Sequence, residues 1–361
     1  MVRIKDVAEA VGVSTATVSN VINGKEQRVS KEVREKIQTA LDEMGYVRNR
    51  SAMMLAQTNS NMIGVVIPCK EGVKITLEDP YYSALLGNLE YEIRAHGCTM
   101  YLISQQSEEE IIRQAIAWNL EGLIVCNMVQ EELAGLCEKY RRGVVSIDSY
   151  LNRSARFINI ATDDFGGAYE MGKYLIRRGH TRIAMLADND ATVDHHRCLV
   201  GSEMCIRDSH RWMGLQQAMK EAGLAITEKD HFLFSSSESV RELQFAQFLP
   251  DWKNYTALFV ASDYYALEVS SFLQSRGIRV PEDISITGFD DLIYASLARP
   301  KLTTMSQNIG KKAKMAVEAL LSLCEKKGEQ KDTENLWEEK WQLPVKLVER
   351  ESVSDRMYKN K

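Results

Sequence analysis

The sequence predicts a small all-α unit at the N-terminus joined to an α/β body of two doubly wound parallel-sheet lobes. Two observations support this fold class. Apolar residues in the first fifty positions recur with the period of an α-helix. After Met62, short runs rich in β-branched residues alternate with helix-length stretches, a pattern typical of parallel sheets covered by helices. With 361 residues, the chain is also long enough for several domains.

Composition limits the class of protein. Apolar residues make up 45% and charged residues 26% of the chain, as in soluble globular proteins with a sizeable core. The longest apolar runs, such as “IGVVIP”, are too short to span a bilayer, and the charged N-terminus is unlike a secretory signal. Seven cysteines at irregular spacing fit reduced thiols. We therefore expect a cytoplasmic protein without a membrane segment.

Charge is unevenly distributed along the chain. Residues 1–50 hold nine Lys/Arg and seven Asp/Glu, a balance of +2, whereas the remaining residues have a balance of −7. The total of −5 argues against nucleic-acid binding by the whole surface. A weakly positive N-terminal unit on an acidic body still permits DNA binding by that unit.

Three helices are expected in the first fifty residues. Apolar residues at i, i+3, i+4 and i+7 give the first helix one apolar face: Ile4, Val7, Ala8 and Val11. Gly12 supplies a turn, and Ser14 is a good N-cap for a second helix that runs to about Asn23. The third helix begins near Ser30. Its apolar residues are in register: Val33, Ile37, Ala40, Leu41 and Met44.

The second helix has two different faces. One face is apolar and consists of Val18, Val21 and Ile22. The other, about 135° away at 100° per residue, presents short side chains: Thr15, Ala16, Ser19 and Asn20. Two helices around a glycine turn, closed by a third, form a helix-turn-helix, and short polar side chains suit close approach to bases in a major groove. An ordinary three-helix bundle with a solvated face fits the pattern equally well.

The motifs “IKDVAEAVGVSTATVSNVING” and “VSKEVREKIQTALDEMGYVRN” closely resemble the headpiece of the lactose/galactose-repressor (LacI/GalR) family of bacterial transcription regulators. The resemblance implies that Thr15, Ala16 and Asn20 read bases. It implies that a second group holds phosphates or shapes the helix: Ser14, Thr17, Ser19 and Asn23. Many relatives carry arginine at the position of Asn20. Arginine pairs with guanine and asparagine with adenine, so we expect adenine at that operator position.

The segment that follows, residues 48–61, is expected to join the headpiece to the body. “SAMMLAQ” is helix-compatible but too short to be stable alone, and “TNSN” is typical of a linker. The resemblance implies a hinge that becomes helical on operator DNA, with Ala52 and Leu55 at the DNA and Leu55 as the lever that kinks the minor groove. Met53 stands where relatives often have arginine. The alternative is a flexible tether with an incidental leucine.

Eight strands are expected in the body, with helices between most of them. The strand candidates are “MIGVVIP”, “TMYLIS”, “EGLIVCN”, “GVVSID”, “RFINIAT”, “RIAML”, “ALFVAS” and “ISITGFD”. Polar residues follow many of these strands, and open α/β sheets bind ligands beyond the carboxyl ends of their strands. The polar residues at strand ends are Asp148, Asp163, Asp164, Ser262, Asp263, Asp290 and Asp291.

This set suits a neutral polyhydroxylated ligand. A carboxylate accepts hydrogen bonds from adjacent hydroxyls, and aromatic faces pack on sugar C–H groups. The aromatic candidates are Tyr81, Tyr82 and Phe289. Taken singly, each aspartate fits a turn or a helix N-cap better than a ligand contact.

The resemblance continues through the body, in “GVVIP”, “DPYYSALLGNLEYEIRAHG”, “GHTRIAML”, “ALFVASDYYALEV”, “GIRVPEDISITGFDD”, “PKLTTMSQNIGKKA” and “LPVKLVERES”. It implies a body similar to periplasmic sugar-binding proteins, with two lobes, three crossovers, an effector in the cleft and dimerisation. Asp79 replaces the family's asparagine, Ser262-Asp263 replaces a frequent Asn-Asp, and Asp290 matches a recurrent effector contact. These departures leave the effector's identity open.

The expected domains are a headpiece at 1–47, the hinge at 48–61, a body at 62–350 and a tail at 351–361. We place the N-lobe at about 62–161 and 292–322, and the C-lobe at about 162–291 and 323–350. No phosphate-binding loop, dinucleotide fingerprint or nucleophile elbow is present, so we expect neither an enzyme nor a cofactor.

The segment “DHHRCLVGSEMCIRDSHRW”, residues 194–212, interrupts the resemblance. It gathers six metal-ligand candidates, His195, His196, Cys198, Cys205, Asp208 and His210, but with no usual zinc spacing. Relatives have one Arg-x-x-Gly here, and either Arg197 or Arg211 fills the arginine that often touches the effector. Thirteen residues separate the two arginines. They are a metal site, an ordinary insertion, or a translated sequencing-adapter fragment, which “CLVGSEMCIRDS” resembles. We expect residues 198–209 to form an exposed, poorly ordered loop and no metal to bind.

Together these features predict a homodimeric repressor of a pseudo-palindromic operator, controlled by a small molecule of the sugar class. The alternatives are a sugar-binding module without a DNA role, and a regulator that needs a corepressor such as a purine or a phosphocarrier protein. The C-terminal residues show no leucine heptad, which favours a dimer over a tetramer.

Overall fold

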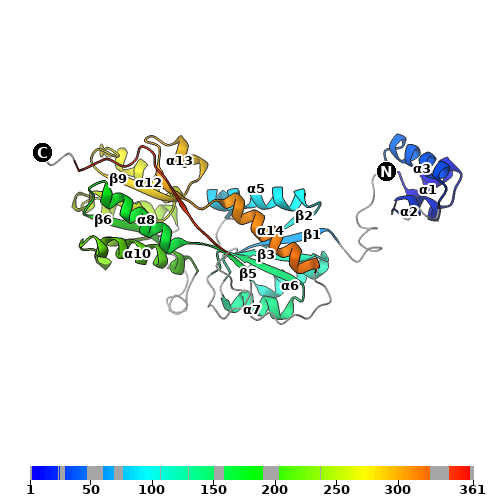
Figure 1. The fold of residues 1–361 in the computed structure, drawn as a ribbon, viewed down its shortest axis with the longest axis horizontal. Helices are drawn as coiled ribbons and strands as arrows, with labels where there is room; N and C mark the ends of the chain where they lie inside the picture. The colour runs from blue at the N-terminus through cyan, green and yellow to red at the C-terminus, as the bar shows by residue number, and fades with distance from the viewer. Residues whose placement is uncertain are drawn as a thin grey trace. The chain divides into compact units, whose positions relative to one another are not determined.

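The computed structural model describes residues 2–22, 24, 29–46, 60–68, 76–105, 107–128, 130–149, 158–189, 203–235, 237–325 and 341–357. The chain divides into two compact units, residues 1–60 and 61–361 (Figure 1). Each unit has its own core.

The first unit contains the three expected helices. These are α1 (Ile4–Val11), α2 (Thr15–Ile22) and α3 (Lys31–Glu43). Gly12 ends α1 in the left-handed conformation at φ 74°, which glycine adopts without strain. The core is formed by the predicted apolar faces: Val7, Ala8, Val18, Ile22, Ile37 and Leu41 are buried, and Ile4, Val11, Val21, Val33, Ala40 and Met44 pack around them. The prediction of a helix-turn-helix core is therefore confirmed.

The second unit contains two sheets. The first has the order β11-β5-β4-β3-β1-β2 and is parallel throughout. Its strands are β1 (Met62–Pro68), β2 (Thr99–Gln105), β3 (Gly122–Cys126), β4 (Gly143–Ile147), β5 (Ile158–Thr162) and β11 (Gln342–Leu343). The helices of this lobe are α5 (Pro80–Ala95), α6 (Glu108–Ala117), α7 (Gln130–Lys139) and α14 (Ile309–Glu325).

The second sheet has the order β12-β10-β9-β8-β6-β7. Its strands are β6 (Ile183–Asn189), β7 (His231–Ser235), β8 (Ala257–Val260), β9 (Ser285–Asp290), β10 (Thr303–Ser306) and β12 (Lys346–Val348). All neighbours are parallel except β10 and β12. The helices here are α8 (Asp164–Arg177), α10 (Glu203–Glu221), α11 (Glu238–Phe248), α12 (Asp263–Gln274) and α13 (Ile293–Leu297).

Both sheets are covered by helices on both faces, as doubly wound sheets are. In the first lobe, Val65 on one face of β1 packs in a core with α5 and α14, and Val66 on the other face packs in a core with α6 and α7. Figure 1 shows α5 and α14 on the opposite side of this sheet from α6 and α7. In the second lobe, Leu186 and Met185 of β6 divide in the same way between two cores. The predicted body fold is confirmed.

The chain crosses between the lobes three times. It leaves the first sheet after Thr162, returns between Ser306 and Ile309, and leaves again between Leu343 and Lys346. The lobe boundaries that we expected at 292 and 323 are therefore wrong. β10 pairs with β9 in the second sheet, and β11 pairs with β5 in the first. These strands contain only four and two residues, too few for their sequence pattern to reveal which sheet they join.

The expected loop at residues 198–209 is also wrong over its second half. Residues 203–209 form the first turns of α10, and Asp208 is buried with 3% of its surface exposed. The stretch “EMCIRDS” contains no glycine or proline, so the helix of the Arg-x-x-Gly motif extends through it, because adding a residue to an existing helix is far easier than starting one. Residues 198–202 lie outside the described residues.

Among the residues that the structure describes, no helix is long and apolar enough to cross a membrane. In the same ranges, no group of three His, Cys, Asp or Glu side chains is placed to hold a metal ion. Asp208 and His210 are two positions apart on α10, and residues at that spacing do not face each other on a helix.

Candidate functional site

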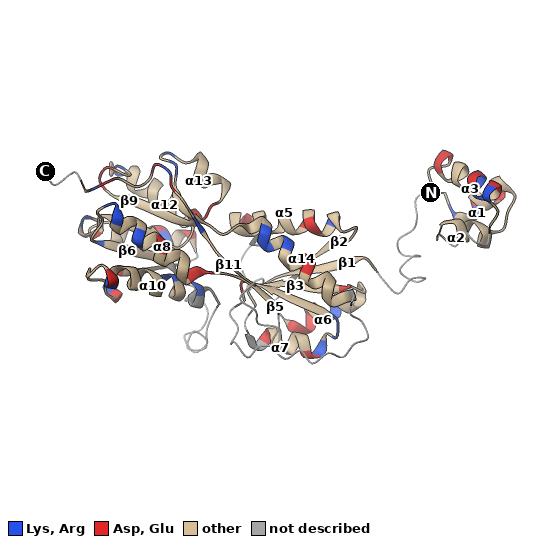
Figure 2. Ribbon diagram, in the orientation of Figure 1, with Lys and Arg blue, Asp and Glu red and all other residues tan. Residues whose placement is uncertain are grey.

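The helix α2 presents the predicted DNA-reading surface of the first unit. Ser14 caps this helix, accepting a hydrogen bond from Thr17 N at 3.1 Å, and its hydroxyl lies 2.8 Å from that of Thr17. Thr15 and Ala16 are exposed, and Ser19 and Asn20 are half-buried. No residue of α2 is charged, whereas α1 and α3 carry both signs (Figure 2). Short uncharged side chains at the start of a helix allow its backbone to come close to base edges.

Four predicted site residues lie outside the described residues: Asn23, Ala52, Leu55 and Arg197. The predicted DNA contacts and effector contacts remain predictions.

In the second unit, the predicted effector contacts Tyr81 and Asp148 meet around a lysine that the sequence analysis did not select. Lys312 is fully buried on α14. Its Nζ lies 2.8 Å from each carboxylate oxygen of Asp148 and 3.0 Å from Tyr81 Oη. Tyr81 donates its own hydroxyl proton to Asp148. Burial alone would raise the pKa of Asp148, but Lys312 and Tyr81 hold it below its ordinary value.

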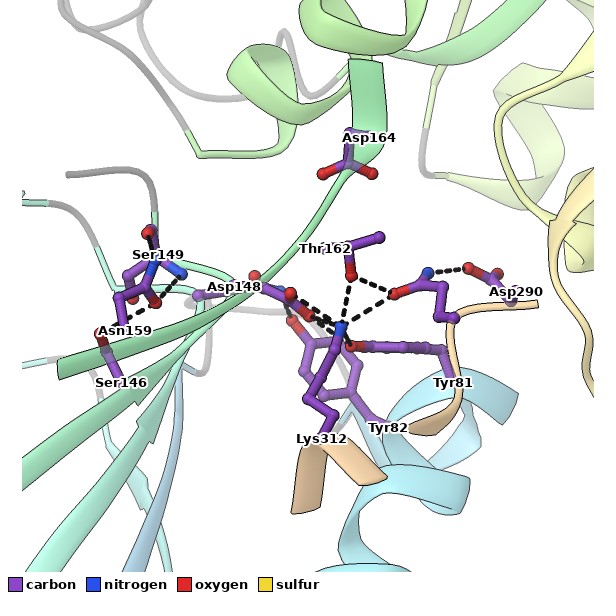
Figure 3. A network of polar contacts seen from close by, with 12 residues as sticks. Tyr81, Tyr82, Ser146, Asp148, Ser149, Asn159, Thr162, Asp164, Asp290 and Lys312 are labelled. Atoms are coloured by element: carbon purple, nitrogen blue, oxygen red, sulfur yellow. Dashed lines mark hydrogen bonds and ion pairs between the residues drawn. The ribbon is translucent and has the colours of Figure 1, made fainter. Parts of the chain in front are cut away.

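The same lysine reaches the first and second crossovers. Lys312 Nζ lies 2.8 Å from Thr162 Oγ1 and 2.8 Å from Gln307 Oε1. Thr162 donates to Gln307 Oε1 at 2.9 Å, and Gln307 Nε2 donates to Asp290 at the end of β9. A continuous chain of hydrogen bonds therefore runs from α5 in the first lobe to β9 in the second (Figure 3).

The carboxylates of Asp148 and Asp290 stand at strand ends where the backbone has positive φ. Asp148 has φ 53° and Asp290 has φ 127°, conformations that side chains other than glycine rarely adopt. Strained residues of this kind cluster at active and ligand sites, although aspartate and asparagine also adopt positive φ in ordinary turns. Burial raises the pKa of Asp290 to about 7, although Arg211, Arg207 and Gln307 act to lower it.

Arg211 is the centre of a second cluster of polar contacts in this region. Its Nε donates to Asp164 at 2.8 Å, its Nη2 lies 2.7 Å from the same carboxylate, and Nη1 donates to the carbonyl of Ala261. The guanidinium carbon lies 3.7 Å from the centre of the Phe289 ring. Of the two arginines predicted for this role, Arg211 is thus buried beside the predicted contact Phe289, and Arg197 lies outside the described residues.

The other predicted effector contacts make local hydrogen bonds. Asp79, Asp163 and Ser262 are N-caps, which accept from the backbone N–H groups of Tyr81 at 2.7 Å, Gly166 at 2.9 Å and Tyr265 at 3.3 Å. Burial raises the pKa of Asp79. Capping is the role that each strand-end aspartate, taken singly, fitted better than a ligand contact on sequence alone.

Two more predicted contacts, the buried Asp263 and the half-buried Tyr82, form hydrogen bonds with protein groups. Asp263 is fully buried and accepts from Leu292 N at 2.8 Å and Thr304 Oγ1 at 2.5 Å. Burial and the nearby Asp290 raise the pKa of Asp263 well above its usual value. Tyr82 accepts from the side-chain amide of Asn127, and burial raises the pKa of its hydroxyl.

A pocket of about 250 Å³ opens beside Asp290. Its lining comes from α5, the end of β9, α13 and the second crossover: Pro80, Ala84, Asn88, Asp290, Asp291, Leu292, Ile293, Tyr294, Ser306, Asn308 and Ile309. A larger hollow of about 500 Å³ lies beside Ile183 and Phe232, at the amino ends of β6 and β7. Open α/β sheets bind ligands at the carboxyl ends of their strands, which favours the pocket at Asp290.

Sequence reasoning missed Lys312, Gln307 and Thr162. A signal for Lys312 was present. The apolar residues of α14 include Ile309 and Ala316, three positions before and four after Lys312, so the lysine stands on the buried face of its helix. Lysine is rarely fully buried without a partner, and such a position in the sequence indicates a buried carboxylate nearby.

Two protein families match parts of the chain. Residues 3–49 match the bacterial regulatory proteins of the lacI family, and residues 173–353 match the periplasmic binding protein-like domain. Among relatives, the HTH-type transcriptional regulator GalR of Escherichia coli K12 is 31% identical over 336 residues, covering 90% of each chain. The HTH-type transcriptional regulator DegA of Bacillus subtilis is 31% identical, covering 85% of this chain and 86% of DegA. The HTH-type transcriptional repressor PurR of Vibrio vulnificus is 30% identical, covering 89% of this chain and 91% of PurR.

Solved structures have the same fold. The lac repressor dimer bound to operator and the anti-inducer ONPF gives a TM-score of 0.78 at 24% identity, covering 98% of this chain and 99% of that one. The complex of the transcriptional regulator CelR with cellobiose gives 0.67 at 23% identity, covering 98% and 100%. A regulator from Enterococcus faecium with bound ribose gives 0.64 at 21% identity, covering 81% and 99%. From its headpiece, its two-lobed body and these relatives, the chain belongs to the lacI family of bacterial regulatory proteins.

Proposed function

We propose that this DNA-binding transcriptional regulator is a cytoplasmic repressor that binds a pseudo-palindromic operator as a homodimer and releases it when a sugar binds between the lobes of its body. Two headpieces read the two half-sites, and the body dimer holds them at the required spacing. A sugar that favours one arrangement of the lobes shifts the protein between states of high and low operator affinity.

The observation that carries the DNA-binding part is the surface of α2. Its first turn is capped by Ser14 and exposes Thr15 and Ala16 without any charged neighbour on the helix. This arrangement suits contact with bases, whereas Lys and Arg elsewhere in the unit suit phosphates.

The effector part is supported by the chemistry around Lys312 and Asp290. Carboxylates, hydroxyls and Tyr81 share one hydrogen-bond network that joins the two lobes. Hydroxyl-rich ligands match such acceptors. Two proteins of the same fold were solved with cellobiose and with ribose, which favours a sugar as the class of effector.

Selection from a random duplex DNA library tests the proposal. The full chain should enrich a pseudo-palindrome, and its affinity should fall steeply with salt because phosphate contacts release counterions. A chain lacking residues 1–60 should lose DNA binding and keep its binding of D-galactose, D-ribose or cellobiose. A module without a DNA role would enrich no sequence.

The direction of the response separates the two modes of control. A sugar inducer weakens binding to the selected operator, whereas a corepressor strengthens it. A purine corepressor is the alternative that the sequence left open, so hypoxanthine, a purine, belongs in the same titration. Tighter operator binding with hypoxanthine and no effect of any sugar would overturn the inducer proposal.

A further inference from the structure

The ammonium of Lys312 lies at the centre of the buried network and can only donate. Five oxygen atoms lie within 3.0 Å of Nζ, two from Asp148 and one each from Tyr81, Thr162 and Gln307. An ammonium group has three protons and no lone pair. Each neighbour must therefore turn an acceptor towards it.

Because Lys312 can only donate, the hydrogen-bond directions of the neighbouring hydroxyl and amide groups are fixed. The Tyr81 hydroxyl accepts from Lys312 and passes its own proton to Asp148. The Thr162 hydroxyl accepts from Lys312 and donates to Gln307 Oε1. Two donors therefore converge on Gln307 Oε1, which leaves Gln307 Nε2 to face Asp290. The orientation of this amide is dictated by its partners rather than free to flip.

The hydrogen bonds that begin at Lys312 thus connect one lobe to the other. Lys312 is on α14, which packs on the first sheet, whereas Asp290 ends β9 of the second sheet. Gln307, in the second crossover, connects them. Above about pH 7, where Asp290 carries its charge, the carboxylate receives an N–H and remains an acceptor, because a carboxylate that takes one hydrogen bond still has free lone pairs. Asp290 also lines the pocket beside the crossover.

We propose that Lys312 is the specificity-determining residue of the effector site: by orienting Gln307 it keeps Asp290 an acceptor, and it thereby selects effectors that present hydroxyl or amino donors over those that present phosphate or carboxylate. This inference rests on the proposed effector site. Lys312 does not itself compensate an anionic effector, because Asp148 neutralises its charge at 2.8 Å and the five surrounding oxygen atoms share its three protons (Figure 3).

The variant that tests this must stay folded. Lys312→Met alone would leave the buried Asp148 carboxylate without its cation, which is strongly destabilising. The double variant Lys312→Met/Asp148→Asn removes both charges and leaves the local net charge unchanged. Its matched control is Lys311→Met, the same change at the exposed neighbouring position.

The first readout needs no effector. Carbon-13 NMR of the aspartate carboxyls, with Asp290→Asn for assignment, gives the pKa of Asp290, which is about 7 in the parent protein. In the double variant Gln307 loses Lys312, one of the two donors that orient its amide, so its hydrogen bond to Asp290 weakens and the pKa of Asp290 should rise by about one unit. The charged groups that act on Asp290 stay in place: Arg207, Arg211, Asp79 and Asp263. An Asp290 that titrates in the double variant as in the parent would overturn the proposal.

The second readout is calorimetric binding to matched pairs of probes, D-galactose against galactose 6-phosphate and D-ribose against ribose 5-phosphate. The parent and Lys311→Met should prefer the unphosphorylated sugar, and the double variant should reduce that preference about tenfold, the worth of roughly one hydrogen bond to a charged group. Tighter binding of a phosphorylated probe by the parent would contradict the inference. If neither member of any pair binds, the proposed sugar effector fails, and the Asp290 titration still decides the role of Lys312.

Discussion

The guanidinium of Arg211 is stacked on the ring of Phe289, 3.7 Å from the ring centre, while it pairs with Asp164 at 2.7 Å. One cation therefore joins α10, β9 and the first residue of α8. Both charged side chains are only 2% exposed, so the contact is screened little by water. The Arg-x-x-Gly motif thus holds α10 against the second sheet, beside the predicted effector contacts.

Replacing this arginine should cost the fold substantial stability. Arg211→Met leaves the Asp164 carboxylate buried without its cation, and breaking a buried pair in this way typically costs about 3–5 kcal/mol. Urea unfolding measures the loss. Arg279→Met is the control, because Arg279 pairs with Asp283 at the surface and its side chain is 69% exposed. Equal losses of unfolding free energy in the two variants would show that the buried ion pair stabilises the fold no more than the surface pair.

The glycine of the same motif should tolerate no side chain. A Cβ at Gly214 would lie 2.3 Å from the carbonyl oxygen of Phe165 and 2.9 Å from Tyr169 N, both backbone atoms of α8. Gly214→Ala must therefore push α10 away from α8, and we expect a loss of about 1–3 kcal/mol on unfolding. Gly87→Ala, in an exposed position of α5 with nothing within 4 Å, should instead stabilise by about 0.5–1 kcal/mol. A neutral Gly214→Ala would mean that α8 and α10 are not tightly packed.

Asn20 should set one base of the operator. Asparagine pairs with adenine through N6 and N7, and arginine pairs with guanine through O6 and N7. Library selection with the parent should enrich adenine at the contacted position, and Asn20→Arg should enrich guanine. One such pair is worth about 1–3 kcal/mol, or roughly five- to 150-fold in affinity between the two operators. Guanine in the sites selected by the parent would refute this assignment.

Asp290 should make stability depend on pH. Its pKa is raised to about 7 in the folded protein, against 3.8 ordinarily, so the fold holds this proton more tightly than the unfolded chain does. The stabilising contribution is fully present below about pH 4 and is lost as the pH rises towards 7. Asp290→Asn should flatten urea-unfolding stability across this window. Asp263, whose pKa is raised too, leaves part of the dependence in place. An unchanged slope would exclude Asp290 as its source.

Where the sequence had strong periodicity, its prediction of the fold held. The apolar faces of the three N-terminal helices became the core of the first unit, and Met62–Pro68 forms a strand with the predicted ends. The strands β10 and β11 gave no such pattern because each is short, so the lobe boundaries were misplaced. Their sheets are decided by pairing with β9 and β5, distant contacts that local pattern does not contain.

The sequence predicted the acidic residues of the candidate site but not their basic partner. Strand ends identified Asp148 and Asp290 because carboxylates at carboxyl ends have a recognisable position. Their partner Lys312 lies 164 residues from Asp148 in sequence and stands on the buried face of a helix. Recognising it required the reverse question, namely which acidic group neutralises a lysine on an apolar face. The sequence shows a lysine on an apolar helix face, but only the folded structure identifies the carboxylate that pairs with it.

A buried carboxylate, Asp208, lies in the segment of residues 198–211. Both carboxylate oxygens of Asp208 are buried without a hydrogen bond among the described residues, and its nearest cation contact is Arg207 at 3.7 Å. Burial raises the pKa of Asp208, so the fold disfavours its charged form. A buried acceptor left unsatisfied costs about 1–3 kcal/mol, and native cores contain few of them.

A segment that belongs to the chain would be expected to satisfy its buried carboxylate, whereas a foreign segment has no reason to. Deleting residues 198–211 joins Arg197 to Trp212 and restores one Arg-x-x-Gly, with Arg197 in the position before Trp212 that Arg211 now holds. We expect the shortened chain to unfold at a higher urea concentration than the full chain, and Asp208→Asn to recover part of that gain. Sequencing the gene across codons 190–216 is the independent check. A less stable deletion variant, together with those codons present in the gene, would establish the segment as a genuine part of the second lobe.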